Sequence, residues 1–126
     1  MLHIVLYQPE IPPNTGNIIR LCANTGTALH LIRPLGFEMT KKSLRRASLD
    51  YSELTKVLDH TSLKEMKKHL PNKKYYAIST KGGTPLYKTR FNKGDILLFG
   101  NETKGLPQKV LSSEDCLDVI RIPMAH

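Results

Sequence analysis

Short apolar runs recur along the chain and alternate with segments whose apolar residues follow helical spacing. Runs of four to six residues predict buried strands at 2–7, 29–32, 55–58, 75–79, 96–99 and 119–122. Helical spacing and capping residues predict helices at 15–25, 41–48, 62–70 and 107–111. The Gly and Pro residues at 81–85 predict a turn.

The first 32 residues read as strand, helix and strand. Asn14 stands where an N-cap is expected, Ile18 and Cys22 share one helical face, and Gly26 is a natural stop. Such a unit requires parallel strands, so the sequence predicts a single α/β domain over residues 1–126 with a parallel sheet. Ligands of such sheets bind where strands end, which here selects the loops 8–14, 79–84 and 100–106.

Composition excludes several classes of protein. The longest apolar runs are far too short to span a membrane, and the amino terminus lacks the pattern of a secretory signal. Two cysteines, Cys22 and Cys116, are too few for a disulfide framework and lack the spacing of a zinc or redox site. We therefore expect reduced thiols, no metal, no membrane contact and a cytoplasmic location.

The net charge of +8 is concentrated in the middle of the chain. Residues 33–93 contain 15 Lys or Arg and 5 Asp or Glu, whereas the segments on either side are nearly neutral or slightly acidic. A basic segment of this kind is typical of proteins that bind a polyanion such as a nucleic acid. A surface enriched in lysine for solubility is the alternative.

The loop FGNETKG, residues 99–105, follows a predicted buried strand and has a glycine near each end. Gly100 and Gly105 would let the backbone approach a flat ligand. Leu106 and Pro107 stand where a phosphate-binding loop needs Lys and Ser or Thr, so ATP hydrolysis is not indicated. A dinucleotide-binding glycine motif and a serine-hydrolase elbow are both absent from the sequence.

The five histidines are scattered singly along the sequence, and each is interpreted as a surface or core-edge residue rather than a catalyst. Asn14 and Arg20 lie near the first strand-to-helix turn, beside the FGNETKG loop if the two strands are neighbours. Taken alone, Asn14 is fully explained as a helix cap, and the alternative for Arg20 is a side chain that only extends its charge into solvent.

Four segments taken together closely resemble the SPOUT superfamily of knotted RNA methyltransferases. They are LYQPEIPPNTGNIIR at 6–20, LRRASLDY at 44–51, FGNETKGLP at 99–107 and RIPM at 121–124. The similarity is to the branch that 2′-O-methylates the wobble nucleotide, the tRNA (cytidine(34)-2′-O)-methyltransferases, and it covers essentially the whole chain in order.

The resemblance implies a parallel-sheet α/β knot that binds S-adenosylmethionine through three loops at the carboxyl ends of strands. By position, the residues that bind this cofactor here are Ile78, Ser79, Thr80, Gly100, Asn101, Glu102, Gly105 and Ile122. Arg20 corresponds to the catalytic arginine of the family, and Asn14 to its supporting partner. The resemblance also implies a homodimer that binds the anticodon stem-loop of tRNA.

The chemistry limits what Arg20 can do. Transfer of a methyl group requires the ribose 2′-hydroxyl to lose its proton and its oxygen to lie in line with the methyl–sulfur bond. An arginine stays protonated in proteins, so it is a poor base. We expect Arg20 to orient a phosphate and to stabilise the developing alkoxide, while a phosphate oxygen or a relay takes the proton.

The basic segment fits tRNA as a partner. Lys41, Lys42, Arg45 and Arg46 are the candidate contacts to anticodon-stem phosphates. Two alternatives to the enzyme remain open at this point. One is a non-catalytic RNA-binding α/β domain with an incomplete cofactor pocket, and the other is a regulator that binds a different adenosine compound at Gly100–Gly105.

The sequence stops at His126, soon after RIPM. In the family this segment leads into a Ser- and Asn-rich loop and a closing helix, which thread the knot, complete the cofactor pocket and form much of the dimer interface. The resemblance therefore implies that this carboxyl-terminal knot segment is missing from the sequence as given.

Overall fold

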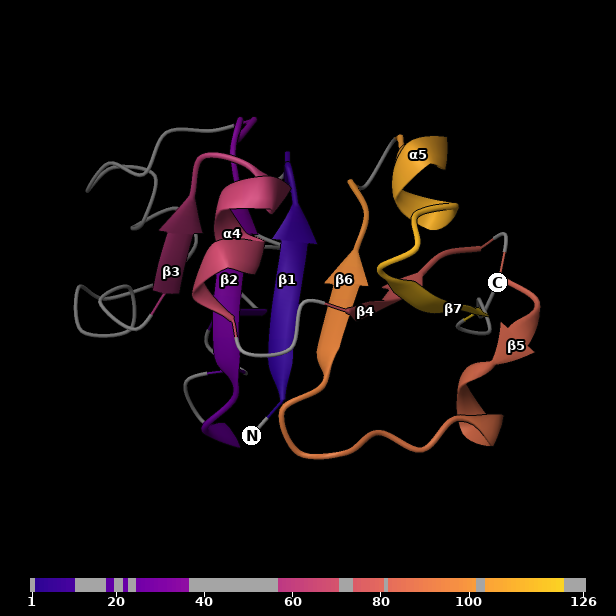
Figure 1. Cartoon of the computed structure of the whole chain (residues 1–126). Coiled ribbons are helices and arrows are strands. Elements are labelled where there is room, and N and C mark those ends of the chain that lie inside the picture. The colour runs from indigo at the N-terminus through magenta and orange to yellow at the C-terminus, as the bar shows by residue number, and fades with distance from the viewer. Residues whose placement is uncertain are drawn as a thin grey trace.

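The structure is a computed structural model that describes residues 2–10, 18–19, 22, 25–36, 57–70, 74–80, 82–101 and 104–121. Seven strands in this part of the chain form one sheet in which every pairing is parallel. They are β1 (His3–Tyr7), β2 (Ala28–Ile32), β3 (Val57–His60), β4 (Tyr75–Ile78), β5 (Thr84–Pro85), β6 (Ile96–Phe99) and β7 (Cys116–Arg121). Their order across the sheet is β3-β2-β1-β6-β4-β7-β5 (Figure 1). The α/β fold with a parallel sheet is confirmed.

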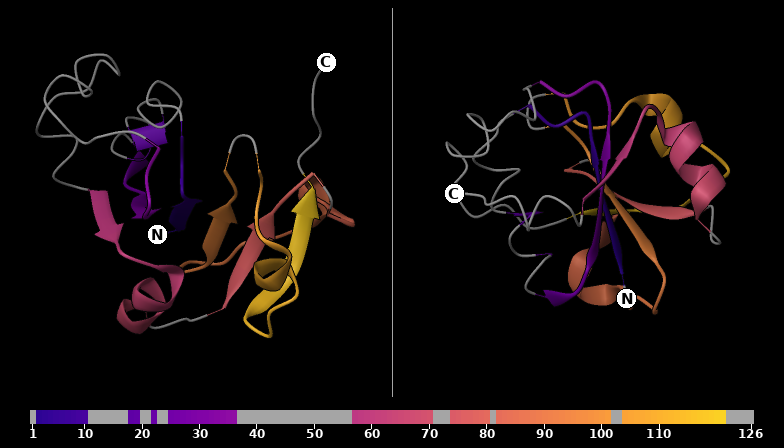
Figure 2. Two further views of the ribbon diagram at one scale, coloured as in Figure 1. Left: turned by 90° about the horizontal axis from the view of Figure 1, so that it is seen from above. Right: turned by 90° about the vertical axis from the view of Figure 1, so that its left-hand side faces the viewer.

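Helices lie on both faces of the sheet. Helix α4 (Leu63–His69) and the short helix α5 (Gln108–Leu111) share one face, as the turned views show (Figure 2). The 3-10 turn η1 (Leu86–Lys88) contributes Leu86 to the opposite face, where Leu86 packs near Ile78 and Ile120. The chain thus has the three-layer arrangement expected when parallel strands are joined by crossovers.

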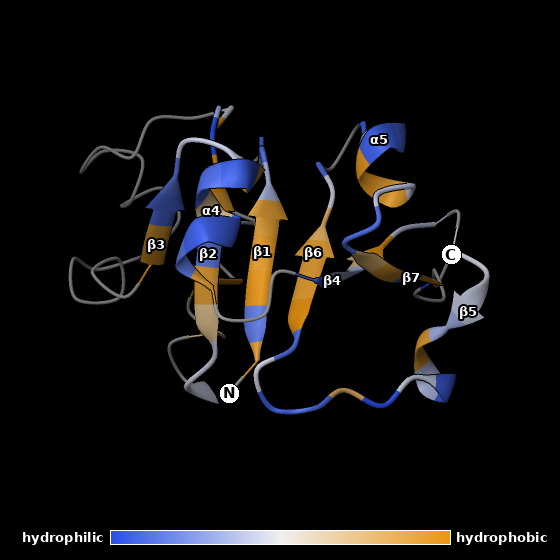
Figure 3. Cartoon of the chain, in the orientation of Figure 1, coloured by the Kyte–Doolittle hydropathy of each residue, from blue (hydrophilic) through white to orange (hydrophobic). Residues whose placement is uncertain are grey.

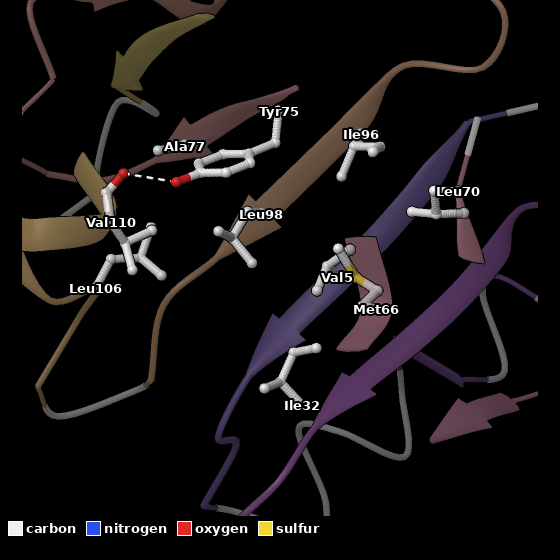
Figure 4. Packing of buried hydrophobic residues seen from close by; sticks show 10 residues of the cluster. All are labelled: Val5, Ile32, Met66, Leu70, Tyr75, Ala77, Ile96, Leu98, Leu106 and Val110. Carbon is white, nitrogen blue, oxygen red and sulfur yellow. Dashed lines mark hydrogen bonds between the residues drawn. The ribbon is translucent and has the colours of Figure 1, made fainter. Parts of the chain in front are cut away.

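The core beneath α4 and α5 is the largest of the three apolar clusters among the described residues. It joins the inward residues of β1, β2, β4 and β6 to Met66 of α4 and Val110 of α5 (Figure 4). The hydroxyl of the buried Tyr75 donates to the carbonyl of Val110 at 2.7 Å, so its polar atom is satisfied inside the core. The colouring by hydropathy agrees with this packing, because the central strands β1 and β6 are mostly apolar and helix α4 is mostly polar (Figure 3).

On the other face, the described residues of the predicted helix 15–25 behave as the sequence indicates. Ile18, Ile19, Cys22 and Thr25 are helical. Ile19 and Cys22 are buried against Leu6 and other residues of β1 and β2. Helix α4 begins with an N-cap, in which the hydroxyl of Ser62 accepts a hydrogen bond from the amide of Glu65 at 3.1 Å.

Three element boundaries differ from prediction. The strand expected at 55–58 is Val57–His60, which pairs with Leu29–Ile32. The prediction ended too early because the last two residues of this strand, Asp59 and His60, are polar and do not belong to an apolar run. The strand expected at 119–122 begins earlier, at Cys116, where it pairs with Tyr75. The predicted turn at 81–85 ends in β5, which pairs with β7. The helix predicted at 41–48 lies outside the described residues.

Candidate active site

Three neighbouring strands bring the predicted ligand loops to one edge of the sheet. β6 pairs with β1 on one side and with β4 on the other, so the residues after Tyr7, Ile78 and Phe99 leave the sheet side by side. β7 adjoins β4, and the Ser79 amide donates to the carbonyl of Ile120 at 2.9 Å. The condition set by the sequence, that the strand before the first strand-to-helix turn and the strand before the FGNETKG loop are neighbours, is met, since β1 pairs with β6.

The FGNETKG loop folds back on itself. The amide of Asn101 donates to the carbonyl of Gly105 at 3.3 Å, and the amide of Gly105 donates to the carbonyl of Asn101 at 3.0 Å. Gly105 has a φ of 65°, a conformation that favours glycine. A Cβ on Gly100 would lie 2.5 Å from the carbonyl carbon of Gly105. The described packing therefore requires glycine at position 100 for the return of the loop itself, whether or not a ligand also needs the space.

The turn after β4 packs against the end of β7 with equal closeness. A Cβ on Gly82 would lie 2.6 Å from the carbonyl carbon of Ile120 and 2.7 Å from the nitrogen of Arg121. Both contacts are with backbone, which cannot move aside cheaply. A Cβ on the next residue, Gly83, would meet no atom of the described residues within 4 Å. Only the first of these two glycines is required by packing.

The exit of β1 is held from three sides. Gln8 has a φ of 48°, which is uncommon for a residue with a side chain. Its amide donates to the carbonyl of Ile32 at 3.0 Å, and its carbonyl accepts from Nδ2 of Asn101 at 2.7 Å. The carbonyl of the next residue, Pro9, accepts from the amide of Gly36 at 2.9 Å.

The predicted cofactor residues that the structure describes all lie at this edge. Ile78 is buried at the end of β4, Ser79 is half-buried and Thr80 is exposed. Gly100, Asn101 and Gly105 belong to the folded-back loop. The other predicted site residues lie outside the described residues. They are Asn14, Arg20, Lys41, Lys42, Arg45, Arg46, Glu102 and Ile122.

His3, His30 and His60, which are far apart in the sequence, lie together in the structure. His3 and His60 are half-buried, as expected of core-edge residues, whereas His30 is fully buried. Nδ1 of His3 lies 2.9 Å from Nε2 of His30, and Nδ1 of His30 lies 2.9 Å from Nε2 of His60. The ring of His69 in α4 stacks near that of His60, with 6.3 Å between centroids. These four residues form a histidine row along β1, β2, β3 and α4. Their spacing in the sequence gives no sign of it, because the row depends on strand order and register.

Burial disfavours the charged form of three of these histidines, His3, His30 and His60. His30 is 1% exposed, and burial, followed by the neighbouring charges of His60 and His3, lowers the pKa of His30 to about 4. Burial also lowers the pKa of His3 and of His60. The rings meet head to tail rather than converging on a point, and no three His, Cys, Asp or Glu side chains among the described residues are arranged so that they could hold a metal ion together.

The family model of the SpoU rRNA methylase family matches residues 1–126. The chain belongs to this family. A tRNA (cytidine(34)-2′-O)-methyltransferase of Saccharophagus degradans is 51% identical over 124 residues, which cover 98% of this chain and 80% of the relative. Most of the relative's length is therefore represented here.

Solved structures agree with this membership. A structure from work on the 2-OH methylation of C/U34 on tRNA superimposes with a TM-score of 0.87 at 45% identity, covering 100% of this chain and 82% of that one. The SpoU methyltransferase AviRb of Streptomyces viridochromogenes, in complex with AdoMet, has a TM-score of 0.76 at 23% identity, covering 100% of this chain and 52% of that one. The second likeness shows that the fold is shared.

Proposed function

We propose that this protein methylates the ribose 2′-hydroxyl of nucleotide 34 of tRNA, a cytidine or uridine, with S-adenosylmethionine as methyl donor. The observation that carries the proposal is that the loops after β1 and β6, which begin two of the family motifs, leave the same edge of the sheet as the loop after β4 and the end of β7. The names of close relatives and the tRNA-directed solved structure supply the substrate.

The described edge fits such a donor chemically. It presents backbone amides and carbonyls beside the hydroxyls of Ser79 and Thr80, next to buried apolar side chains such as Ile78 and Leu106. Apolar walls with a few polar groups are typical of nucleoside sites. Bound there, the donor would supply an electrophilic methyl group. Ile78, Ser79, Thr80, Gly100, Asn101, Glu102, Gly105 and Ile122 are the residues that we propose hold it.

The protein's task in the reaction is to position and to stabilise charge. The ribose hydroxyl must give up its proton as its oxygen attacks, and negative charge develops on that oxygen. We assign to the guanidinium of Arg20 the orientation of the nucleotide phosphate and the stabilisation of this charge, with Asn14 as its support. The proton passes to a phosphate oxygen or a relay, because arginine stays protonated.

The partners follow from charge and family. Lys41, Lys42, Arg45 and Arg46 belong to the basic middle segment and are proposed to contact phosphates of the anticodon stem-loop. A homodimer is proposed, with one subunit helping to hold the tRNA bound by the other, in the cytoplasm where tRNA is modified. No helix in the described part of the chain has the length and apolar character needed to span a membrane.

The direct test is transfer of a labelled methyl group from S-adenosylmethionine into total tRNA, followed by nucleoside mapping. Label at the 2′-oxygen of nucleotide 34 supports the proposal. Binding of tRNA without any transfer, and without donor binding by calorimetry, would leave a non-catalytic RNA-binding domain.

Arg20→Lys probes the chemical assignment. We expect a loss of turnover of about 100-fold, because the planar two-pronged geometry is lost while the charge is kept. Single-turnover rates at saturating donor and tRNA measure it. Near-normal turnover of Arg20→Lys would show that geometry at this position is unimportant.

A further inference from the structure

The side-chain amide of Asn101 connects two loops of the site. Its Nδ2 donates to the carbonyl of Gln8 at 2.7 Å, a contact between residues 93 positions apart in the sequence. Its Oδ1 accepts from the amide of Lys104 at 3.1 Å, inside the FGNETKG loop. One amide group therefore closes its own loop with its acceptor atom and holds the neighbouring loop with its donor atoms.

The atom that Asn101 holds belongs to a strained part of the chain. Gln8 is in the left-handed region at φ 48°, where a residue with a side chain is stable only if its surroundings fix it. Its amide is fixed by Ile32 of β2, on the side away from β6. The Asn101 bond fixes its carbonyl from the β6 side. The turn that begins the segment leading to Asn14 and Arg20 is thus anchored between β2 and the FGNETKG loop.

We propose that Asn101 is a positioning residue, whose side-chain amide sets the placement of the turn after β1 relative to the FGNETKG loop. This inference rests on the proposed function, in which the first segment carries Arg20 and the second binds the methyl donor. Rate in such a reaction depends on alignment between the oxygen and the methyl group. Donor affinity depends on the loop's own fold, which the Lys104 bond supports.

The two side-chain hydrogen bonds just described, to Gln8 and from Lys104, can be removed separately. Asn101→Asp keeps an acceptor for the Lys104 amide and loses the donor to Gln8. Asn101→Ser also keeps an acceptor near the backbone, is too short to reach Gln8 and adds no charge. Asn101→Ala loses both bonds. Asn92→Asp is the matched control, because Asn92 is exposed before β6, at the opposite end of that strand.

The experiment begins with the wild-type protein and total tRNA, so that failure of the proposed function is seen first as an absence of transfer. Three quantities are then measured for each variant: the single-turnover rate at saturating substrates, the dissociation constant of S-adenosylmethionine by calorimetry, and the melting temperature. We expect Asn101→Asp and Asn101→Ser to lower the rate by about 10- to 100-fold. Their donor affinity should stay within about twofold, and Asn101→Ala should lose donor affinity as well.

With an active wild type, two results would overturn the inference. One is a normal rate in both Asn101→Asp and Asn101→Ser. The other is a parallel fall of rate, donor affinity and melting temperature in these two variants, which would mean that the side chain of Asn101, and not only its backbone within the loop, binds the donor or supports the fold. Asn92→Asp should match the wild type in all three quantities.

Discussion

The two halves of the sheet differ in the polar groups that they bring together: side chains in one half and backbone atoms in the other. In the half formed by β1, β2 and β3, the histidine row leads from the surface into the sheet, with His30 almost fully buried, His3 and His60 half-buried and His69 exposed. In the half formed by β6, β4 and β7, the polar groups of interest are backbone atoms at the strand ends, brought together by glycines. Both halves are built from the same parallel strand pairing.

The two halves should therefore be sensitive to different changes. Protonation of a buried imidazole destabilises the folded protein, because the charged form cannot be hydrated inside it. A backbone cluster held by glycines is sensitive to added volume, because backbone atoms cannot move aside. An added methyl group at a closely packed glycine should therefore destabilise the β6–β4–β7 half, and a fall in pH should destabilise the β1–β2–β3 half.

Gly82→Ala is expected to have the largest effect on stability. The new methyl group would lie within 2.8 Å of three backbone atoms of β7, so either the turn or the strand must shift. We expect a loss of about 3 kcal/mol in the free energy of unfolding, measured by urea titration. The same shift should weaken binding of S-adenosylmethionine.

The adjacent residue provides the control for this prediction. Gly83→Ala places its methyl group where no atom of the described residues lies within 4 Å, so its effect on unfolding should stay within about 0.5 kcal/mol. Equal destabilisation by the two substitutions would mean that the close packing of the turn against β7 is not what limits position 82.

Acid is expected to destabilise the β1–β2–β3 half. The pKa of His30 is lowered by burial to about 4 in the folded protein, against an ordinary value of 6.5 in the unfolded chain. The groups facing it are His3 from β1 and His60 from β3, with Asp59 and His69 acting on His60. Between these two pKa values the unfolded chain binds the extra proton, so stability is full above about pH 6.5 and falls as the pH drops toward 4.

The size of this effect should approach about 3 kcal/mol near pH 4, measured as the unfolding free energy at a series of pH values. His30→Gln keeps a donor and an acceptor but cannot titrate, so its stability should fall less steeply over the same range. Identical slopes for the wild type and His30→Gln would show that other groups cause the acid sensitivity.

The same contrast explains what the sequence could predict. The candidate site in the β6–β4–β7 half could be predicted because Gly100 and Gly105 follow an apolar run, and because parallel strands that end together place their loops together. The four motifs then linked the loops to a family. The reason for glycine at 100 and 82 could not be read, since it depends on backbone contacts between segments distant in the sequence.

The histidine row shows the corresponding failure. His3, His30 and His60 meet because β1, β2 and β3 are neighbours and their registers place the three residues diagonally across one face. Singly, each resembles an ordinary histidine in or beside an apolar run. The bond from Asn101 to Gln8 was missed for the same reason, as it needs the pairing of β1 with β6.

The smallest expected effect tests whether polar side chains in the β1–β2–β3 half matter only when buried. Arg33 and Asp59 form a two-pronged ion pair at the exits of β2 and β3, with distances of 2.7 to 3.1 Å, but their side chains are 48% and 38% exposed. Asp59→Asn should therefore lower the unfolding free energy by only about 0.5 kcal/mol, and less at high salt. Glu114→Gln, which removes one charge from an exposed residue of the other half, is the control. A loss as large as that seen on acidification would mean that the ion pair, through its contact with the end of β3, helps to hold His60 in the histidine row.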